Sequence, residues 1–392
     1  MKLSSLRILA TVCLTACSSA VLSHPAEDQR ERVKSVVDMM VQPVMKQYGI
    51  AGMAVGVIVA GRPYEFDYGV ASIKTGKPVT HDTLFELGSL SKTLTVTLTS
   101  YAQESGQLKL SDTTSQYLPA LQGTPFGDLS LLELGTHTTG GLPLQVPDDI
   151  KDEAQLIKYL QAWHPAYAPG SYRTYSNVSI GTLGLITAVS LHQPFDTLME
   201  QRLFPALGMK SSYIKVPAAG MADYAQGYTR ENAPIRMADA VLSEEAYGIR
   251  TTAADMLRFL EANLGLIELD PKLQRAIANT HTGYFKAGEM TQDLIWEQYA
   301  YPVDLKTLLA GNSSSLIFNA TPVTRLAPPE QAREDVLLNK TGSTNGFGAY
   351  IAFVPQEKFG IVMLANKNFP INDRVTMAHQ ILTLLASRGK EH

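Results

Sequence analysis

Cysteine is almost absent from this 392-residue sequence: Cys13 and Cys17 are the only two, and both lie near the amino terminus. No disulfide can join distant parts of the chain, so a packed core must stabilise it, which a chain of this length can build. The eight histidines are scattered, without the H-x-H or H-E-x-x-H spacing of short-range zinc ligands. The sequence therefore predicts no metal and no cofactor, and a zinc site built from distant histidines is the alternative.

Basic runs and basic–aromatic stripes are also lacking, and the formal net charge is −4. Nucleic acid is therefore not an expected partner. Outside the amino terminus, no apolar run approaches the roughly 18 residues that a membrane-spanning helix needs. With 45% hydrophobic and 18% charged residues, the composition is that of an ordinary globular protein.

The first 23 residues have the pattern of an export signal. Lys2 and Arg7 flank the start of the apolar run 8–16, which is too short to span a bilayer, and small residues follow it. The sequence thus predicts a signal peptide at residues 1–23 and a mature chain in the periplasm. The alternative is a lipoprotein, because Leu-Thr-Ala-Cys at 14–17 resembles a lipobox whose cysteine would carry the lipid.

Apolar periodicity predicts two pairs of strands at opposite ends of the chain. The first pair lies at 53–59 and 64–70, and the second at 347–354 and 359–365. Helical spacing predicts a helix beside each pair, at 29–48 and from about 374 to 387. The middle of the chain is consistent with helices at 89–105, 151–163, 177–191 and 194–206, whereas residues 301–335 give no pattern that we can assign.

These elements predict an α/β fold of the mixed α+β kind. Both chain ends would build one antiparallel sheet flanked by the terminal helices, with a helical subdomain inserted between them. We expect a single domain at 24–392. Its sheet-containing part would cover about 24–85 and 207–392, and its mainly helical part about 86–206.

A serine followed three residues later by a lysine occurs at Ser89 and Lys92, where a turn leads into an apolar helix. If Ser89 opens that helix, Lys92 projects from the same face one turn later, and its ammonium favours a serine alkoxide. Gly88 lets the chain turn sharply before it. The same spacing at 212–215 lies in an irregular stretch, and at 387–390 it lies at the chain end. Chance alone produces serine–lysine pairs at this spacing. The position of Ser89 at a turn before an apolar helix is therefore a stronger argument for a catalytic serine than the spacing itself.

Two further triplets, Y-x-N and K-T-G, follow in the chain. Tyr175 and Asn177 lie where a loop enters an apolar helix, so the phenol can act as acid or base and the amide as a hydrogen-bond partner, or the aromatic ring is simply structural. K-T-G at Lys340 precedes a run of glycines and an alternating strand, whose edge a ligand can approach closely. The copy at Lys74 lies in a polar turn with no such strand behind it, so we select Lys340.

Taken in this order, S-x-x-K, Y-x-N and K-T-G resemble the motifs of class C serine β-lactamases, the AmpC-type cephalosporinases. Shared blocks include F-E-L-G-S at 85–89, G-G-L-P-L-Q at 140–145, E-A-Y-G at 245–248 and M-L-A-N-K-N at 363–368. The resemblance implies the serine β-lactamase/DD-peptidase fold and hydrolysis of the β-lactam amide bond, with cephalosporins preferred over penicillins, and hence β-lactam resistance. Class A enzymes have S-D-N in place of Y-x-N, and the lack of G-x-S-x-G excludes an α/β-hydrolase.

The resemblance assigns four residues to catalysis. Ser89 is the nucleophile that forms the acyl-enzyme, and Lys92 and Tyr175 share its activation. Tyr175 also activates the water that removes the acyl group, and which of these two groups holds the proton at each step stays open. The backbone N–H groups of Ser89 and Ser343 form the oxyanion hole.

Seven further residues are assigned to substrate binding: Gln145, Asn177, Tyr247, Lys340, Thr341, Asn368 and Arg374. Lys340 and Thr341 would bind the substrate carboxylate, with Asn368 nearby and Arg374 at the same end. Gln145 and Asn177 would hold the acyl side-chain amide, and Tyr247 would form an apolar wall. The chain departs from some members at Asn339, which stands where they have a histidine.

Two other activities share the fold. A D-alanyl-D-alanine peptidase or penicillin-binding protein has all three motifs, and a serine esterase of the same fold often lacks K-T-G. A cell-wall-binding module without activity would need Ser89 or Lys92 replaced, and both are present. The expected partner is therefore a small-molecule β-lactam, and the expected state is a monomer.

Overall fold

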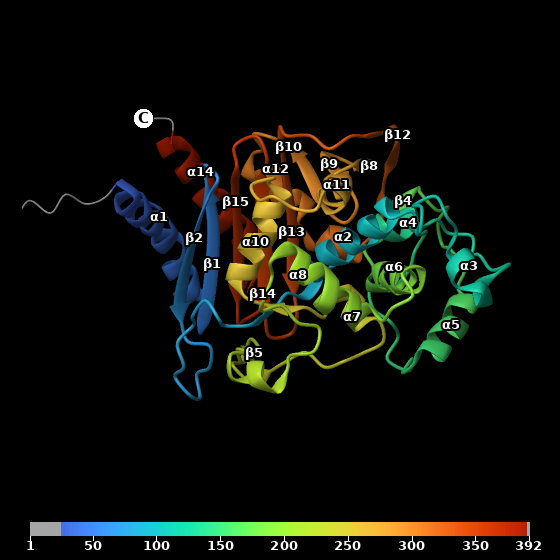
Figure 1. Cartoon of the computed structure of the whole chain (residues 1–392), viewed down its shortest axis with the longest axis horizontal. Helices are drawn as coiled ribbons and strands as arrows, with labels where there is room; N and C mark the ends of the chain where they lie inside the picture. Colours follow the sequence, from blue (N-terminus) through green and yellow to red (C-terminus); the bar gives the residue numbers. More distant parts are fainter. Residues whose placement is uncertain (1–24, 390–392) are drawn as a thin grey trace, which may run out of the picture.

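A computed structural model describes residues 25–389, so the predicted signal peptide lies outside the described residues. One antiparallel sheet has the strand order β12-β8-β9-β10-β13-β14-β15-β1-β2 (Figure 1). The strands are β1 Gly52–Val59, β2 Arg62–Gly69, β8 Gly283–Ala287, β9 Met290–Gln292, β10 Glu297–Ala300, β12 Thr324–Glu330, β13 Val336–Ser343, β14 Gly348–Val354 and β15 Phe359–Ala365.

The sheet joins the two ends of the chain. β1 pairs with β15, placing Met53 opposite Ala365, and the hairpins β1–β2 and β14–β15 flank this pairing. The terminal helices α1 (Pro25–Tyr48) and α14 (Ile371–Gly389) pack against each other on one face of the sheet. The predicted sheet of both chain ends, flanked by terminal helices, is confirmed.

The two faces of the sheet belong to separate cores, because successive side chains of a strand point to opposite sides. On β1, Met53 and Val55 face α1 and α14, whereas Ala54 and Ile58 face the opposite core. That second core is completed by α2 (Ser91–Glu104), α10 (Ala253–Asn263) and α11 (Pro271–Thr280).

The middle of the chain is helical, as predicted, and it has a third core of its own. Its central helix is α6 (Asn177–Ser190), which packs against α2, α4 (Leu131–Gly135) and α9 (Ser243–Tyr247), and α5 (Glu153–Ala162) adds side chains to the same core. The predicted helix at 194–206 is α7 (Phe195–Leu198), a π-helical turn at 199–203 and α8 (Phe204–Leu207). No helix within residues 25–389 is long and apolar enough to cross a membrane.

The carboxy-terminal third of the chain contains elements that the sequence pattern did not predict. Besides α11, β8, β9 and β10, these include α12 (Leu305–Gly311), α13 (Ser314–Phe318), β11 (Thr321–Pro322) and β12. β12 contains Pro328 and Pro329 and is an edge strand, where a missing N–H breaks no ladder. K-T-G was predicted to precede a strand. It does precede β14, and it also lies near the end of a strand of its own, β13.

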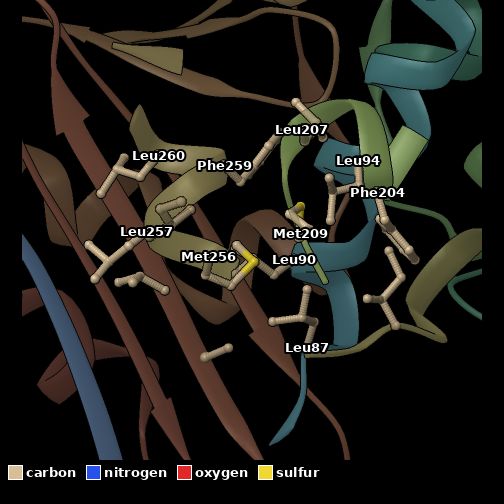
Figure 2. Close-up of a cluster of buried hydrophobic side chains, with 14 of the residues drawn as sticks. Leu87, Leu90, Leu94, Phe204, Leu207, Met209, Met256, Leu257, Phe259 and Leu260 are labelled. Carbon is tan, nitrogen blue, oxygen red and sulfur yellow. The ribbon is translucent and has the colours of Figure 1, made fainter. Parts of the chain in front are cut away.

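The turn that carries Ser89 rests on the second core. Leu87, Leu90 and Leu94, on either side of Ser89, belong to one cluster with Met209, Met256 and Phe259 (Figure 2). This cluster includes residues of both the helical middle and the sheet, so the two parts share buried contacts.

Candidate active site

Ser89 lies in a 3₁₀ turn, Gly88–Leu90, that leads directly into α2. Gly88 has φ +55°, and a Cβ on it would lie 2.4 Å from the carbonyl oxygen of Ser343. Glycine is therefore needed twice over, for the left-handed backbone and for the contact between this turn and β13. The contact holds the serine hydroxyl beside the end of the strand that carries K-T-G.

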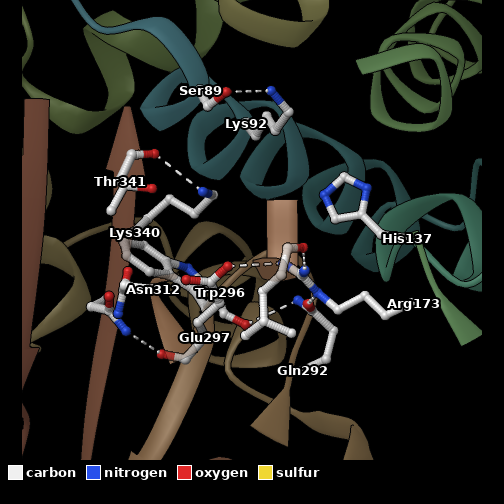
Figure 3. Close-up of polar contacts among 12 residues, drawn as sticks. Ser89, Lys92, His137, Arg173, Gln292, Trp296, Glu297, Asn312, Lys340 and Thr341 are labelled. Atoms are coloured by element: carbon white, nitrogen blue, oxygen red, sulfur yellow. Dashed lines mark hydrogen bonds and ion pairs between the residues drawn. The ribbon is translucent and has the colours of Figure 1, made fainter. Parts of the chain in front are cut away.

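Lys92 lies one turn after Ser89, and its ammonium is buried beneath the serine. Its Nζ donates to Ser89 Oγ at 2.9 Å and to the carbonyl oxygen of Ala246 at 2.8 Å (Figure 3). Burial lowers the pKa of Lys92 to about 8, with a further lowering from the positive charge of Lys340. A lysine with this pKa can accept or return a proton near neutral pH.

Tyr175 is buried against three cations. The ring centroid lies 5.1 Å from Lys340 Nζ, 5.3 Å from Lys92 Nζ and 5.4 Å from the Arg173 guanidinium carbon. Burial by itself would raise the pKa of this phenol, but the charges of Lys340 and Lys92 outweigh it and lower the pKa to about 8. Because Lys92 and Tyr175 interact closely, the two groups titrate as a pair.

The start of α6 places Tyr175 and Asn177 at the site. Ser176 is the N-cap of the helix: its Oγ accepts from the backbone N–H groups of Val178 and Ser179. Asn177 Nδ2 donates to Gln145 Oε1 at 2.8 Å, so the two predicted amide-binding residues are in contact.

The end of β13 supplies Lys340, Thr341 and Ser343. Lys340 is buried, and its Nζ donates to the carbonyl oxygen of Thr341 at 3.1 Å. Arg374 lies behind the strand, where Nη1 donates to the carbonyl oxygen of Gly342 at 2.6 Å and to Ser343 Oγ at 3.0 Å, and Nη2 donates to Asn368 Oδ1. The guanidinium therefore holds Ser343 and Asn368 in place, and burial lowers its pKa to about 9.

These side chains line a cavity of about 1070 Å³ between the helical middle and the sheet. Nine of the eleven predicted site residues lie on its wall: Ser89, Gln145, Tyr175, Asn177, Tyr247, Lys340, Thr341, Ser343 and Asn368. Lys92 lies beneath Ser89, and Arg374 lies behind β13.

The competing copies of the motifs lie away from this cavity. Gly76, of the other K-T-G, has no atoms within 4 Å of where its Cβ would be, as an exposed turn requires. Ser212 is bound to Thr251 and to Asp255, each at 2.7 Å, and Lys215 is paired with Asp196 instead of with the serine. Ser387 is exposed near the end of α14.

A buried ion pair in the wall of the same cavity, between Arg173 and Glu297, was not foreseen from the sequence. Arg173 donates to Glu297 Oε1 at 2.9 Å and to Gln292 Oε1 at 2.6 Å (Figure 3). It lies two residues before Tyr175 on β4 (Tyr172–Arg173), and its partners are on β9 and β10. Asn339, the residue that departs from some family members, donates through Nδ2 to the backbone oxygen of Glu297 at 3.0 Å. Because the partners are distant in sequence, no local pattern points to this cluster.

Within residues 25–389, no group of three or more His, Cys, Asp and Glu side chains is arranged to hold a metal ion. A mechanism without a metal stays a prediction.

The chain belongs to the beta-lactamase family, whose model, described as Beta-lactamase, matches residues 37–386. It is 50% identical over 353 residues to the beta-lactamase of Pseudomonas fluorescens, covering 90% of this chain and 99% of that one. To the beta-lactamase of Lysobacter lactamgenus it is 47% identical over 386 residues, covering 98% and 100%.

Among the solved structures that this chain resembles are class C beta-lactamases. A class C beta-lactamase in complex with cefoxitin has a TM-score of 0.89 and 50% identity, covering 91% of this chain and 99% of that one. The D-alanine carboxypeptidase AmpC of Burkholderia cenocepacia has a TM-score of 0.87 and 58% identity, covering 90% and 99%. The resemblance to class C serine β-lactamases is confirmed.

Proposed function

We propose that this protein hydrolyses the amide bond of β-lactams, cephalosporins in preference to penicillins, through an acyl-enzyme on Ser89, and so gives β-lactam resistance. The observation that supports this most is the arrangement around the hydroxyl of Ser89. Lys92 Nζ is 2.9 Å from Ser89 Oγ, and Tyr175 lies between Lys92 and Lys340 on the same cavity. Ser89 is hydrogen-bonded to Lys92, and the Lys92–Tyr175 pair, with pKa values of about 8, can accept its proton.

In acylation, Ser89 Oγ attacks the β-lactam carbonyl carbon while its proton passes to the Lys92–Tyr175 pair. The carbonyl oxygen becomes an oxyanion that the backbone N–H groups of Ser89 and Ser343 stabilise. When the C–N bond breaks, the proton passes from the pair to the departing nitrogen. In deacylation, Tyr175 takes a proton from water while the water oxygen attacks the acyl carbonyl carbon. As the bond between Ser89 Oγ and that carbon breaks, Tyr175 returns the proton to Ser89 Oγ.

The substrate would span the cavity from the strand to α6. Lys340 and Thr341 bind its carboxylate beside Asn368, and Gln145 and Asn177 bind the amide of its acyl side chain. Tyr247, at the end of α9 beside α6, provides apolar surface for that side chain.

Replacement of the nucleophile tests this function. Ser89→Ala should abolish hydrolysis of a chromogenic cephalosporin while the circular dichroism spectrum is unchanged, because loss of a covalent nucleophile can cost up to about 10⁶ in kcat. Ser387→Ala, in the exposed copy of the motif, is the matched control and should keep full activity. Activity of Ser89→Ala within about tenfold of wild type would reject the proposal. Wild-type activity should also be unchanged by a chelator.

A second candidate function is removal of a terminal D-alanine. Solved relatives from Burkholderia cenocepacia and Pseudomonas syringae are described as D-alanine carboxypeptidase AmpC and as beta-lactamase/D-alanine carboxypeptidase. Intact-protein mass during turnover of a cephalosporin separates the two. A lactamase should show no lasting adduct, whereas a peptidase should keep an acyl group for hours and release D-alanine from a peptide ending in D-Ala-D-Ala.

We also propose that the protein is exported to the periplasm as a monomer. The mass of the exported chain should correspond to an unmodified amino terminus near His24. A diacylglyceryl group on Cys17 would instead show a lipoprotein. A native mass of one chain would support the monomer.

A further inference from the structure

His137 is a buried histidine that touches the segment carrying Tyr175 at several points. It lies in the loop after α4 and is 1% exposed. Its carbonyl oxygen accepts from the N–H of Thr174 at 2.8 Å, and its Nδ1 accepts from the N–H of Ser176 at 3.3 Å. The residues before and after Tyr175 are thus both held by His137.

The imidazole ring also packs on the phenol itself. The centroids of the His137 and Tyr175 rings lie 4.4 Å apart, with 46° between the ring planes. In Figure 3 the imidazole lies beside Lys92 and Arg173, two of the cations that surround the phenol. The ring therefore closes one side of the space in which Tyr175 lies.

The protonation of His137 follows from these contacts. Nδ1 lies 3.3 Å from the backbone nitrogen of Ser176 and 3.0 Å from Ser179 Oγ: it accepts from the first when the proton of the neutral ring is on Nε2, and donates to the second when that proton is on Nδ1. Nε2 is buried without a hydrogen-bond partner among the described residues. Burial, with the charges of Arg173, Lys92 and Lys340, holds the pKa of His137 well below its usual range, so the ring stays neutral beside the cations.

We propose that His137 is a positioning residue that fixes the Tyr175 phenol between Lys92 and Lys340. The proposal rests on the proposed role of Tyr175 in catalysis. His137 fixes the backbone on both sides of the tyrosine, blocks one face of its ring, and adds no positive charge that would compete with the lysines. A displacement of about 1 Å in such a group can reduce the rate about 100-fold.

The backbone of His137 offers two well-matched variants. Its φ is +59°, a conformation that glycine and asparagine adopt more readily than other residues. His137→Gly removes both the ring and the acceptor for Ser176 without added backbone strain. His137→Asn removes the ring but places an amide oxygen where Nδ1 accepts.

Steady-state kinetics across pH, with a chromogenic cephalosporin, tests the proposal. His137→Gly should lower kcat by about 10- to 100-fold, and His137→Asn should restore most of that loss. On the acid side of the pH profile kcat/KM rises with pH, and we call this part the rising limb. In His137→Gly the rising limb should move to higher pH by at least about 0.5 unit, since a phenol that leaves the lysines regains a pKa nearer 10. The charged groups that act on the pKa of Tyr175 are Lys92 from α2, Lys340 from β13 and Glu297 from β10, and Arg173 from β4 also faces its ring.

Three outcomes would overturn the proposal. The first is a His137→Gly protein with kcat and pH profile close to wild type. The second is an equal loss in both variants with an unmoved limb, as expected if His137 only supports folding. If His137→Gly does not fold, a folded His137→Asn whose kcat is lowered by more than about tenfold, with kcat/KM rising at the wild-type pH, overturns the proposal, and a His137→Asn with kcat near wild type supports it. Tyr175→Phe is measured alongside: if it stays active, the role of Tyr175 fails, independently of His137.

Discussion

Lys340 has two effects at the residue scale, because it faces the substrate and also the phenol of Tyr175. Its charge lowers the pKa values of both Tyr175 and Lys92. Removing the charge of Lys340 should therefore raise both pKa values. The pH profile should then shift in the same direction whichever of the two groups holds the proton.

Lys340→Met, which keeps the length of the side chain, should move the rising limb of kcat/KM to higher pH, because deprotonation of the pair then requires a higher pH. The measurement is kcat/KM for a chromogenic cephalosporin between pH 5 and 10. Lys74→Met, in the other K-T-G, is the control and should leave the limb in place. A limb at the wild-type pH in Lys340→Met would contradict this account of the charges.

The sequence predicts the residues that belong to a motif and misses those that act through tertiary contact. Ser89, Lys92 and Lys340 were predicted because each lies in a short pattern beside a turn or strand. His137 and Arg173 lie in no such pattern, and their contacts to the Tyr175 segment depend on packing between distant elements. Local patterns cannot indicate such contacts.

Asp293 is a second buried group, away from the nucleophile, with consequences for stability. It is fully buried and neither carboxylate oxygen has a hydrogen-bond partner within the described part of the chain. Burial raises its pKa well above the usual range, with a further rise from Glu330. In the unfolded chain the carboxyl ionises near pH 4. Between about pH 4 and the raised pKa of the folded protein, folding therefore takes up a proton, and the stability falls as the pH rises through that range.

Asp293→Asn removes this ionisation and should stabilise the protein more at pH 8 than at pH 4. Linkage of this kind is on the order of 1–3 kcal/mol for one carboxyl. Urea denaturation at the two pH values measures the difference, and Asp149→Asn, at an exposed carboxyl, should show no such gain. A gain that is equal at both pH values would mean that Asp293 is ionised in the folded protein.

At the scale of elements, the site depends on the close approach of two segments, the turn at Gly88–Leu90 and the strand β13. A Cβ on Gly342 would lie 2.1 Å from the carbonyl oxygen of Leu87 and 2.9 Å from the backbone nitrogen of Leu90. Neither atom can move without moving the turn that carries Ser89. The glycine of K-T-G is thus required by packing between elements.

Gly342→Ala should separate the turn from the strand. We expect a loss of at least about tenfold in kcat/KM, and a loss of about 1–3 kcal/mol in the free energy of unfolding, as is typical of overpacking. The matched control is Gly76→Ala, in the other K-T-G, which meets no atom within 4 Å. Its φ of +66° should cost about 1 kcal/mol, and its activity should stay at the wild-type level. Equal activities of the two variants would contradict the packing argument.

The elements that the sequence predicted correctly are those with a regular apolar pattern. β1, β14 and β15 are buried along their whole length and read as continuous apolar runs, and α14 has one apolar face at helical spacing, so both patterns are clear in the sequence. β10 has the sequence Glu-Gln-Tyr-Ala, in which Glu297 and Gln298 are buried and the carboxylate of Glu297 is paired with Arg173 of β4. A strand with buried polar residues shows no apolar alternation in the sequence. The residue that pairs with its carboxylate is distant in the chain, so no local pattern indicates the strand.

At the scale of the molecule, the helical and sheet parts are expected to behave as one domain. The second core contains Leu94 and Phe204 of the helical middle together with Met256 and Ile351 of the sheet part. The cavity is also lined from both parts. Because the parts share a core, neither can unfold without exposing buried surface of the other, so we expect a single cooperative transition.

The two tryptophans allow a direct test, because one lies in each part. Trp163 packs edge-on against Phe126 in the core of the helical middle, and Trp296 packs edge-on against Phe353 in the core beside the sheet. Trp296→Phe leaves a fluorophore in the helical part, and Trp163→Phe leaves one in the sheet part.

In each variant, the urea midpoint from fluorescence should coincide with the midpoint from circular dichroism of the same protein. That comparison within one variant removes the effect of the substitution on stability. If the fluorescence of Trp163 changed at a lower urea concentration than the circular dichroism, the helical middle would unfold separately, and the single domain at 24–392 would be wrong.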